Sequence, residues 1–412
     1  MKQFLRMKSA AALIAGLAYL GFALLNARFA LPLIRDGFAR QLADSAVAGL
    51  KERVEKLNYE INENVRGRNA FVTLHGFVQR VLDKNEENNF EVAKDTAGFG
   101  HFIWFQREVW LDKKVLDRTV KLKSLLPGKT NFTVVLALDR VVKGYTTFER
   151  GLPNTYINER ADLFLDGLRK NGIDYFDLRD RLDSAGSDKS ALFFKTDHHW
   201  QIETAFWAYT ELAKFLRQNH GFSADDFYLD KNNYNFITYK KHYLGSMGRK
   251  TGLAYMGADD FTVIYPKFKT DYVYTWRSDM DNADKALSGR FETALLAPLD
   301  HGHADFFDNG DKYFTYLYGN PGLAHIVNKN NRDGSKLLFV KDSFAPPVAA
   351  FLSLLCSEVW LIDPRWYEGE IGDFVAGGDF DHVFLFLSPS LLDSAFFTFC
   401  ADDAAQTETD RL

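Results

Sequence analysis

The chain has 412 residues, of which 46% are hydrophobic and 25% are charged, a balance that suits a folded protein with a large buried core. The formal net charge is −5, so the chain has no excess of basic residues that would bind phosphates, and we expect no nucleic-acid partner. Aromatic residues reach 15%, including 37 Phe and 18 Tyr. This richness predicts a Phe-rich core, with a sugar-binding aromatic surface as the alternative.

The N-terminus differs in kind from the rest of the chain. Three basic residues precede an uncharged run over residues 9–27, which Arg28 closes and which is long enough to span a bilayer as a helix. No clear cleavage site follows, which favours an uncleaved signal-anchor over residues 1–35. The positive flank should stay inside, so we expect the body of the protein outside the cytoplasm, in the cell envelope. The charged residues 36–64 predict a stalk helix, or else a solvated linker helix.

Apolar runs and helical patterns alternate over most of residues 65–400. Residues 132–138 form a short, nearly all-apolar run, which is typical of a strand covered on both faces. Further strands are predicted at 173–178, 337–341, 359–362 and 383–387, and helices at 111–126, 158–170 and 200–220. The alternation predicts an α/β layered fold with a mostly parallel sheet in one domain.

Residues 225–300 break this rhythm, being rich in Tyr, Thr, Asn and Gly. Runs at 261–266 and 272–276 indicate a β-rich insertion. An insertion of this kind can build a substrate cleft over a sheet edge, and a purely structural hairpin pack is the alternative. The acidic tail, residues 401–412, is predicted to be disordered.

Two segments far apart in the sequence carry the residue types of serine-nucleophile chemistry. Residues 197–200 read Asp-His-His-Trp, and Ser343 follows the strand predicted at 337–341. Two prolines after Ser343 suit the first turn of a helix, so the serine should lie at the carboxyl end of the strand and face a helix N-terminus. A carboxylate can orient a histidine, which can take the serine proton. The alternative is that Ser343 is only a helix N-cap.

The histidine of such a triad must be chosen between two neighbours. In an extended segment, Asp197 and His199 project to one side and His198 to the other, so we expect His199 as the general base and Asp197 as its orienting carboxylate. A rigid loop could instead pair Asp197 with His198, and two exposed histidines remain possible. A metal site at this segment is a further alternative, with residues 301–303 as the remaining source of ligands. No Cys/His spacing indicates structural zinc.

These motifs also carry a resemblance. Residues 196–200 resemble the signature of the DHHW family, which is similar to the SGNH-like domain of the alginate O-acetyltransferases. Three further segments are similar to that pattern, namely 341–344, Gly319-Asn320 and 359–365. The resemblance runs from about residue 65 to about residue 388, and its Asp-x-His pair corresponds to Asp197 and His199. It implies an SGNH-like fold with an acyl-transfer site.

The resemblance also implies which groups hold the developing oxyanion. It points to the Ser343 N–H, Gly319 and the Asn320 amide, although Gly-Asn-Pro-Gly is equally a plain turn. The side chains expected to contact substrate are Tyr318, Arg249 and Trp200. For Trp200 the first expectation is that it packs its loop onto the body, and a wall of the substrate cleft is the alternative. Asp363 and Arg365 are expected to form a structural ion pair.

Taken together, the motifs predict a membrane-anchored enzyme that handles O-acyl groups, with O-acetyl expected, on a cell-surface polysaccharide. Ser343, His199 and Asp197 would act without a cofactor. The resemblance favours a transferase over an esterase, and a transferase outside the cytoplasm would need an acyl donor, for which a multi-spanning membrane acyltransferase is the expected partner. The alternative function is a non-catalytic protein of the cell envelope that binds glycan or assists assembly while keeping the SGNH-like fold.

Overall fold

The computed structural model describes residues 67–400 apart from 88, 104–106, 153–154, 187–189, 279–282, 300–310 and 394, together with Val65 and a few positions between 20 and 31. The predicted signal-anchor, stalk and tail therefore fall almost wholly outside the described residues. In the part of the chain that is described, no helix is both long and apolar enough to cross a membrane. The chain divides into a unit over residues 1–78 and a second unit over 79–412, and helix α3 (Arg68–Val81) begins in the first.

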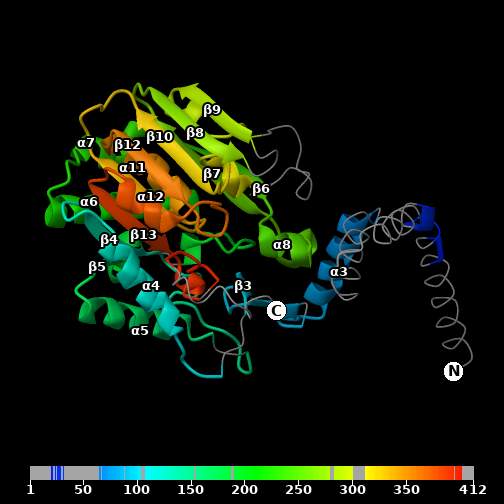
Figure 1. Ribbon diagram of the computed structural model, residues 1–412. Coiled ribbons are helices and arrows are strands. Elements are labelled where there is room, and N and C mark those ends of the chain that lie inside the picture. The colour runs from blue at the N-terminus through cyan, green and yellow to red at the C-terminus, as the bar shows by residue number, and fades with distance from the viewer. Residues whose placement is uncertain are drawn as a thin grey trace, which may run out of the picture. The chain divides into compact units, whose positions relative to one another are not determined.

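An eight-stranded sheet forms the centre of the second unit, in the order β5-β4-β13-β11-β12-β10-β8-β9 (Figure 1). The first five strands in this order are mutually parallel, and β10, β8 and β9 are antiparallel. The bounds are β4 Asn131–Leu136, β5 Asp174–Asp177, β8 Tyr272–Ser278, β9 Ala283–Gly289, β10 Leu323–Asn328, β11 Lys336–Lys341, β12 Glu358–Ile362 and β13 His382–Leu387. The predicted mostly parallel sheet is thus a mixed one with a parallel half.

Helices cover both faces of this sheet because the parallel strands are apolar on both sides. Along β11, Leu337 and Phe339 join one core, while Leu338 and Val340 join the core on the opposite face. Helices α6 (Ile202–His220) and α11 (Ala345–Leu352) pack into the first core. Helices α4 (Lys113–Ser124), α5 (Ile157–Lys170) and α12 (Ile371–Gly377) pack into the second. The result is the predicted α/β layered architecture.

The β-rich segment is not a separate insertion. Strands β8 and β9 pair with β10 and so extend the central sheet on its antiparallel side. Only β6 (Tyr234–Tyr243) and β7 (Asp259–Pro266) form a sheet of their own, and they contribute Tyr234, Phe261 and Ile264 to the first core. Residues 225–300 are β-rich as expected, and β8 and β9 also belong to the central sheet. The sequence pattern did not reveal this pairing, because pairing beyond the local hairpin leaves no local signal.

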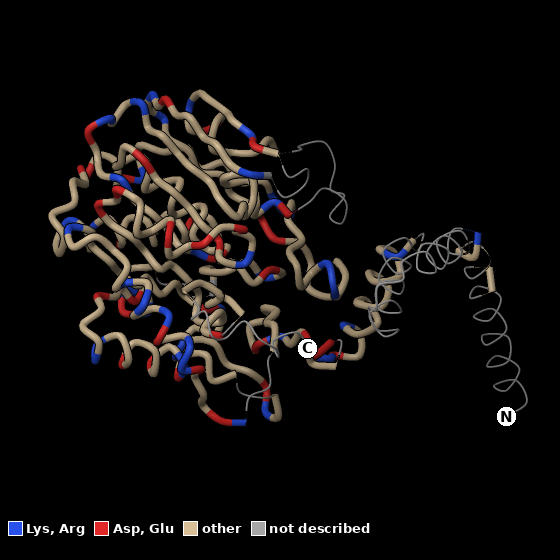
Figure 2. Tube along the Cα trace, in the orientation of Figure 1, with Lys and Arg blue, Asp and Glu red and all other residues tan. Residues whose placement is uncertain are grey.

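The remaining elements are short. A three-stranded sheet consists of β1 (Glu86–Glu87), β2 (Val92–Lys94) and β3 (Gly100–Phe102). Short helices lie at α7 Asp226–Leu229, α8 Ser246–Thr251, α9 Leu253–Met256, α10 Phe291–Ala294, η1 Leu178–Ala185, η2 Ser190–Leu192, η3 Lys231–Asn233, η4 Lys312–Thr315, η5 Ser353–Leu355 and η6 Pro389–Leu391. Basic and acidic residues are mixed along the described chain of the second unit (Figure 2), in keeping with the small net charge.

Candidate active site

The carboxyl ends of four neighbouring parallel strands meet around one cavity of about 220 Å³. This edge of an open α/β sheet is where ligands bind. Each strand contributes residues that follow it directly, namely Asp139 and Arg140 after β4, Asp342 and Ser343 after β11, Arg365 after β12, and Ser388 and Ser390 after β13. His198 also lines the cavity. The sheet therefore gathers residues that are more than 200 positions apart in the sequence.

Ser343, His199 and Asp197 form a continuous hydrogen-bonded row. The His199 Nε2 lies 2.7 Å from the Ser343 Oγ, and the His199 Nδ1 lies 2.6 Å from the Asp197 Oδ1. A carboxylate can only accept, so Nδ1 carries the proton and Nε2 is left as an acceptor for the serine hydroxyl. This is the arrangement in which a histidine can act as a general base toward a serine.

The Asp-His-His-Trp segment is a tight turn and not the extended chain assumed from the sequence. An isolated antiparallel bridge pairs Phe193 with Trp200, and the Phe194 N–H donates to the His199 carbonyl at 3.2 Å. Within the turn, the Asp197 Oδ1 accepts the His199 N–H at 2.9 Å as well as the ring Nδ1–H. The Asp197–His199 pair thus arises from this local turn, and the argument from strand alternation was wrong although it selected the same pair.

Asp197 is fully buried and both of its carboxylate oxygens are occupied. The Ser246 N–H donates to Oδ2 at 2.6 Å, at the start of α8. Burial alone would raise the pKa of Asp197, but the neighbouring His198 and His199, with the hydrogen bonds from His199 and the Ser246 N–H, hold its pKa well below the usual value. The carboxylate is therefore ionised beside the imidazole it orients.

Two charged residues, the buried Arg140 and the half-buried Asp259, fix the turn from outside. The Arg140 guanidinium donates to the carbonyls of Gly100 and Phe194, to that of Lys195 at 3.1 Å and to that of Asp197 at 2.6 Å. On the other side, the Asp259 carboxylate accepts the Lys195 N–H at 2.7 Å and the Thr196 N–H at 2.8 Å. Because both groups bind backbone atoms, they hold the path of the chain through the turn.

His198 lies next to His199 and does not point away from the site as expected. The ring centroids of the two histidines are 3.8 Å apart, and the His198 Nδ1 contacts the Ser246 Oγ at 3.0 Å. Desolvation at the cavity and the neighbouring His199 lower the pKa of His198, against the opposing effect of Asp197, although 40% of the side chain is exposed to solvent. His198 is thus a neutral wall of the cavity, while His199 contacts Ser343.

The Ser343 turn is set by its neighbour Asp342. The Asp342 carboxylate accepts the Phe344 N–H at 2.8 Å and the Ser388 N–H at 2.7 Å, which joins the ends of β11 and β13. The N-cap of α11 is Phe344, so Ser343 is not the helix cap that was the alternative reading. No described residue accepts the Ser343 backbone N–H, which leaves this donor available to a ligand.

The predicted oxyanion groups Gly319 and Asn320 lie in a different environment from the one the motif implied. The Asn320 amide donates to the buried Asp363 at 2.5 Å, and its carbonyl accepts from the buried Lys341 ammonium. The Gly319 N–H donates to the Tyr316 carbonyl at 3.3 Å. Neither residue is among those that line the Ser343 cavity. Their assignment to the oxyanion stays a prediction without a contact to Ser343.

The three side chains expected to contact substrate lie elsewhere too. Trp200 is fully buried, with its ring at an edge-to-face angle to Phe344 at 5.2 Å, so it packs the loop and does not form a cleft wall. The Arg249 guanidinium pairs with Asp311 at 3.1 Å. Tyr318 stacks on Trp276 at 4.8 Å. None of the three is among the residues that line the Ser343 cavity, and each is held by contacts within the protein.

Sequence reasoning missed Arg140, Asp259 and the cavity-lining position of Arg365. Arg140 did carry a signal, because it follows directly after a buried strand at the edge where parallel strands present their sites. Arg365 was noted only as half of an ion pair with Asp363. Asp259 carried no signal, since it lies at the start of a strand whose place in the fold the sequence did not reveal.

Asp197, His198 and His199 also form a group that could hold a metal ion among the described residues, with one ligand atom from each within 4.8 Å of the others. Both His199 ring nitrogens already have partners in Asp197 and Ser343, and the His198 Nδ1 has one in Ser246. A metal at His199 would displace one of these contacts. The donor set therefore fits a serine triad better than a metal centre.

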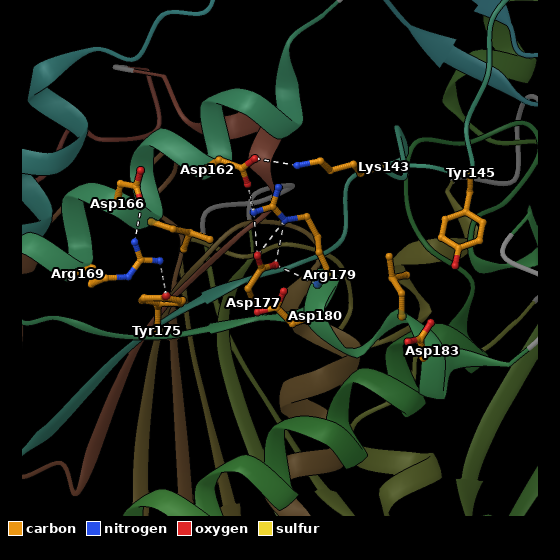
Figure 3. Close-up of a pocket in the computed structure, with 12 residues that line it drawn as sticks. Lys143, Tyr145, Asp162, Asp166, Arg169, Tyr175, Asp177, Arg179, Asp180 and Asp183 are labelled. Carbon is orange, nitrogen blue, oxygen red and sulfur yellow. Dashed lines mark hydrogen bonds and ion pairs between the residues drawn. The ribbon is translucent and has the colours of Figure 1, made fainter.

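A second cavity, of about 480 Å³, lies between α5, β5 and η1 (Figure 3). Ion pairs cross it, with Asp162 3.0 Å from Lys143 and 2.8 Å from Arg179. No serine, cysteine or histidine is among the described residues that line it. Lys143 belongs to the loop that also carries Arg140, so the pair with Asp162 helps tie that loop to α5.

A family model matches the part of the chain that contains the Asp-His-His-Trp turn. Residues 140–258 match the family model of the SGNH hydrolase-like domain of the acetyltransferase AlgX. That range contains the Asp-His-His-Trp turn and ends before Ser343. The resemblance predicted from the motifs is thereby confirmed. No curated protein matches the chain.

Solved structures extend the likeness over most of the chain. A DHHW family protein from Eubacterium siraeum is 14% identical with a TM-score of 0.52, covering 74% of this chain and 93% of its own. PatB1 from Bacillus cereus is 17% identical with a TM-score of 0.58, covering 75% of this chain and 99% of its own. The same protein with a sulfonyl adduct gives 16% identity and a TM-score of 0.55, covering 75% and 97%. At these identities the likeness shows a shared fold.

Proposed function

We propose that this protein is a serine-dependent O-acyltransferase that transfers acetyl groups to a cell-surface polysaccharide. The observation that carries the proposal is the 2.7 Å contact between the His199 Nε2 and the Ser343 Oγ, with Asp197 behind the imidazole. The match to the SGNH hydrolase-like domain of an acetyltransferase supports the same chemistry.

The reaction follows from the roles of the three side chains. The Ser343 Oγ attacks the acyl carbonyl carbon while its proton passes to the His199 Nε2, and the carbonyl electron pair moves onto oxygen. When the carbonyl re-forms, the bond to the leaving group breaks and His199 returns the proton to that group. Asp197 keeps the imidazole oriented and stabilises its positive charge. A sugar hydroxyl, activated by His199 in the same way, then takes the acetyl group from Ser343.

The competing non-catalytic function predicts triad residues too far apart to touch. The hydrogen bonds between Asp197, His199 and Ser343 argue against that reading. The acyl-enzyme can give its acetyl group to a sugar hydroxyl or to water. We infer transfer from the likeness to an acetyltransferase domain.

The proposal includes a place for the enzyme. The uncharged run at residues 9–27 would anchor it in the cell membrane with the Ser343 cavity outside the cytoplasm. There the acetyl group must be delivered across the membrane, for which a multi-spanning membrane acyltransferase is the proposed partner. This part rests on the sequence of the N-terminus and on the acyl chemistry.

Hydrolysis and transfer of acetyl from p-nitrophenyl acetate test the proposal. The wild-type protein should release p-nitrophenol, and a neutral oligosaccharide acceptor added to the assay should gain acetyl groups. Ser343→Ala should abolish both while the melting temperature stays nearly unchanged, because a turn serine contributes little packing. Turnover by Ser343→Ala equal to that of the wild type would refute the nucleophile.

A further inference from the structure

Arg365 lines the Ser343 cavity, and the proposed reaction has so far given its side chain no role. It follows β12 and lines the same cavity as Ser343. Its Nε and Nη2 bind the two oxygens of Asp363 at 2.9 and 2.7 Å, which fixes the guanidinium plane. The Arg365 guanidinium is therefore oriented before any ligand binds. The N–H groups that Asp363 does not bind point in a fixed direction.

The third guanidinium nitrogen, Nη1, makes no hydrogen bond with any described residue. The Arg365 side chain keeps 28% of its surface exposed, whereas Asp363 is fully buried. Arg365 also lines the Ser343 cavity, so part of this side chain is open to a ligand there.

The charge around Arg365 leaves it able to bind an anion. Asp363 is shared with the buried Lys341 ammonium at 3.3 Å, so two cations face one carboxylate. The charges of Asp342 and Asp393 also act on Arg365. The Asp342 oxygens already accept two backbone N–H groups, and the Asp393 Oδ1 accepts the Ala395 N–H. Neither acid forms an ion pair with the guanidinium.

The donors implied by the family motif leave a gap that Arg365 can fill. The Asn320 amide is bound to Asp363 and the Gly319 N–H to a carbonyl, as described above. The Ser343 N–H has no acceptor among the described residues, but a single amide is a weak oxyanion site. A second donor is needed on the cavity side of Ser343.

We propose that Arg365 is a catalytic residue that donates from Nη1 to the oxyanion formed when Ser343 attacks the acyl carbonyl, alongside the Ser343 N–H. The inference rests on the proposed function. In this step the new bond joins the Ser343 Oγ to the carbonyl carbon, the serine proton goes to His199, and the carbonyl π pair becomes the oxyanion lone pair. Asp363 and Lys341 act as positioning residues that hold the guanidinium.

The test compares Arg365→Met and Arg365→Lys with the wild type in p-nitrophenyl acetate hydrolysis. Arg365→Met should lower kcat by about 10²–10³-fold with KM little changed, as removal of one oxyanion donor does. Arg365→Lys should have a kcat between those of Arg365→Met and the wild type, because lysine restores the positive charge but not the planar set of guanidinium donors. The matched control is Arg217→Met, which also breaks an arginine–aspartate pair, with Asp226 at 2.7 Å, but does not line this cavity.

A boronic acid gives a second readout, because its adduct with serine carries a negative charge like the oxyanion. The inhibition constant of phenylboronic acid should rise in Arg365→Met by about the factor by which kcat/KM falls. An unchanged kcat, a loss confined to KM, or unaltered boronic acid inhibition would each overturn the role. If Arg365→Met does not fold, the fall in kcat and the weaker boronic acid inhibition must be seen in Arg365→Lys. Ser343→Ala distinguishes the proposed function from the oxyanion role of Arg365. Full activity of Ser343→Ala would refute the proposed function. An inactive Ser343→Ala together with a fully active Arg365→Met would refute only the oxyanion role.

Discussion

Gly245 lies against the side chain of Asp197, so closely that a Cβ built on Gly245 would come within 2.2 Å of the Asp197 Cβ. The Asp197 Cα would be 2.7 Å away and the Oδ2 2.5 Å away. The loop before α8 and the Asp-His-His-Trp turn are therefore in direct contact, and the Ser246 N–H can reach the buried carboxylate only because position 245 has no side chain. The acid of the triad depends on a residue that takes no part in the chemistry.

The Gly245→Ala substitution should disturb this contact. The added methyl group must push Asp197 or the loop aside, which costs about 1–3 kcal/mol of stability and moves the carboxylate that orients His199. We expect a marked loss of kcat and a lower urea midpoint. The control is Gly128→Ala, where nothing lies within 4 Å of the added Cβ. Wild-type activity in Gly245→Ala would show that the turn tolerates the displacement.

Arg140 should prove to be a positioning residue for the same turn. Arg140→Met removes the guanidinium donors from four carbonyl oxygens, including that of Asp197, so we expect both kcat and stability to fall. Arg140→Lys keeps a charge but reaches fewer carbonyls, and should recover stability more than kcat. Arg169→Met removes an exposed arginine paired with Asp166 and serves as the control. If Arg140 had a purely structural role, kcat and stability would recover to the same extent in Arg140→Lys.

Asp197 predicts how stability depends on pH. Its folded-state pKa lies well below the ordinary value of 3.8, so its contribution is fully present above that value and is lost as pH falls through the folded pKa. The free energy of unfolding of the wild type should therefore exceed that of Asp197→Asn at neutral pH, and the difference should shrink below about pH 4. Urea unfolding of both proteins from pH 7 to pH 3 measures this. A difference that grows toward low pH would contradict the assignment.

The two adjacent histidines should behave differently when replaced. His199→Ala should lose activity as completely as Ser343→Ala, and the double variant should be no worse, because the members of a triad act as a unit. His198→Ala should keep most of the activity, since its Nδ1 contacts the Ser246 Oγ and no contact joins it to Ser343. Kinetics with p-nitrophenyl acetate distinguish the two. Equal losses that added Zn²⁺ restores would favour the metal reading instead.

Local pattern was enough to predict the parallel half of the sheet and the three residues of the hydrogen-bonded row, Asp197, His199 and Ser343. Runs such as residues 337–341 are apolar on both faces, which identifies a buried strand and places Ser343 at its carboxyl end. The antiparallel half was not predicted in full, because β9 and β10 alternate in burial along their length and carry no continuous buried run. The groups that hold the site escaped for a similar reason. Arg140 and Asp259 act on backbone atoms of a distant turn, and no periodicity records such a contact.

The predicted substrate contacts were not found at the Ser343 cavity, for a different reason. Tyr318, Arg249 and Trp200 were chosen by residue type and nearness to motifs, and each is engaged by Trp276, Asp311 or the core. Arg365 was set aside because an arginine two positions from an aspartate usually signals an ion pair. The pair does exist, yet it occupies only part of the guanidinium.

The covalent intermediate tests the central claim most directly. The wild-type protein is mixed with p-nitrophenyl acetate, quenched in acid on the millisecond scale and digested for peptide mass spectrometry. The account predicts one acetyl group on the peptide that contains Ser343, located on that serine by fragmentation, and none in Ser343→Ala or His199→Ala. Turnover without acetylation of Ser343, or an acetyl group carried on a different residue, would contradict the claim that Ser343 is the nucleophile.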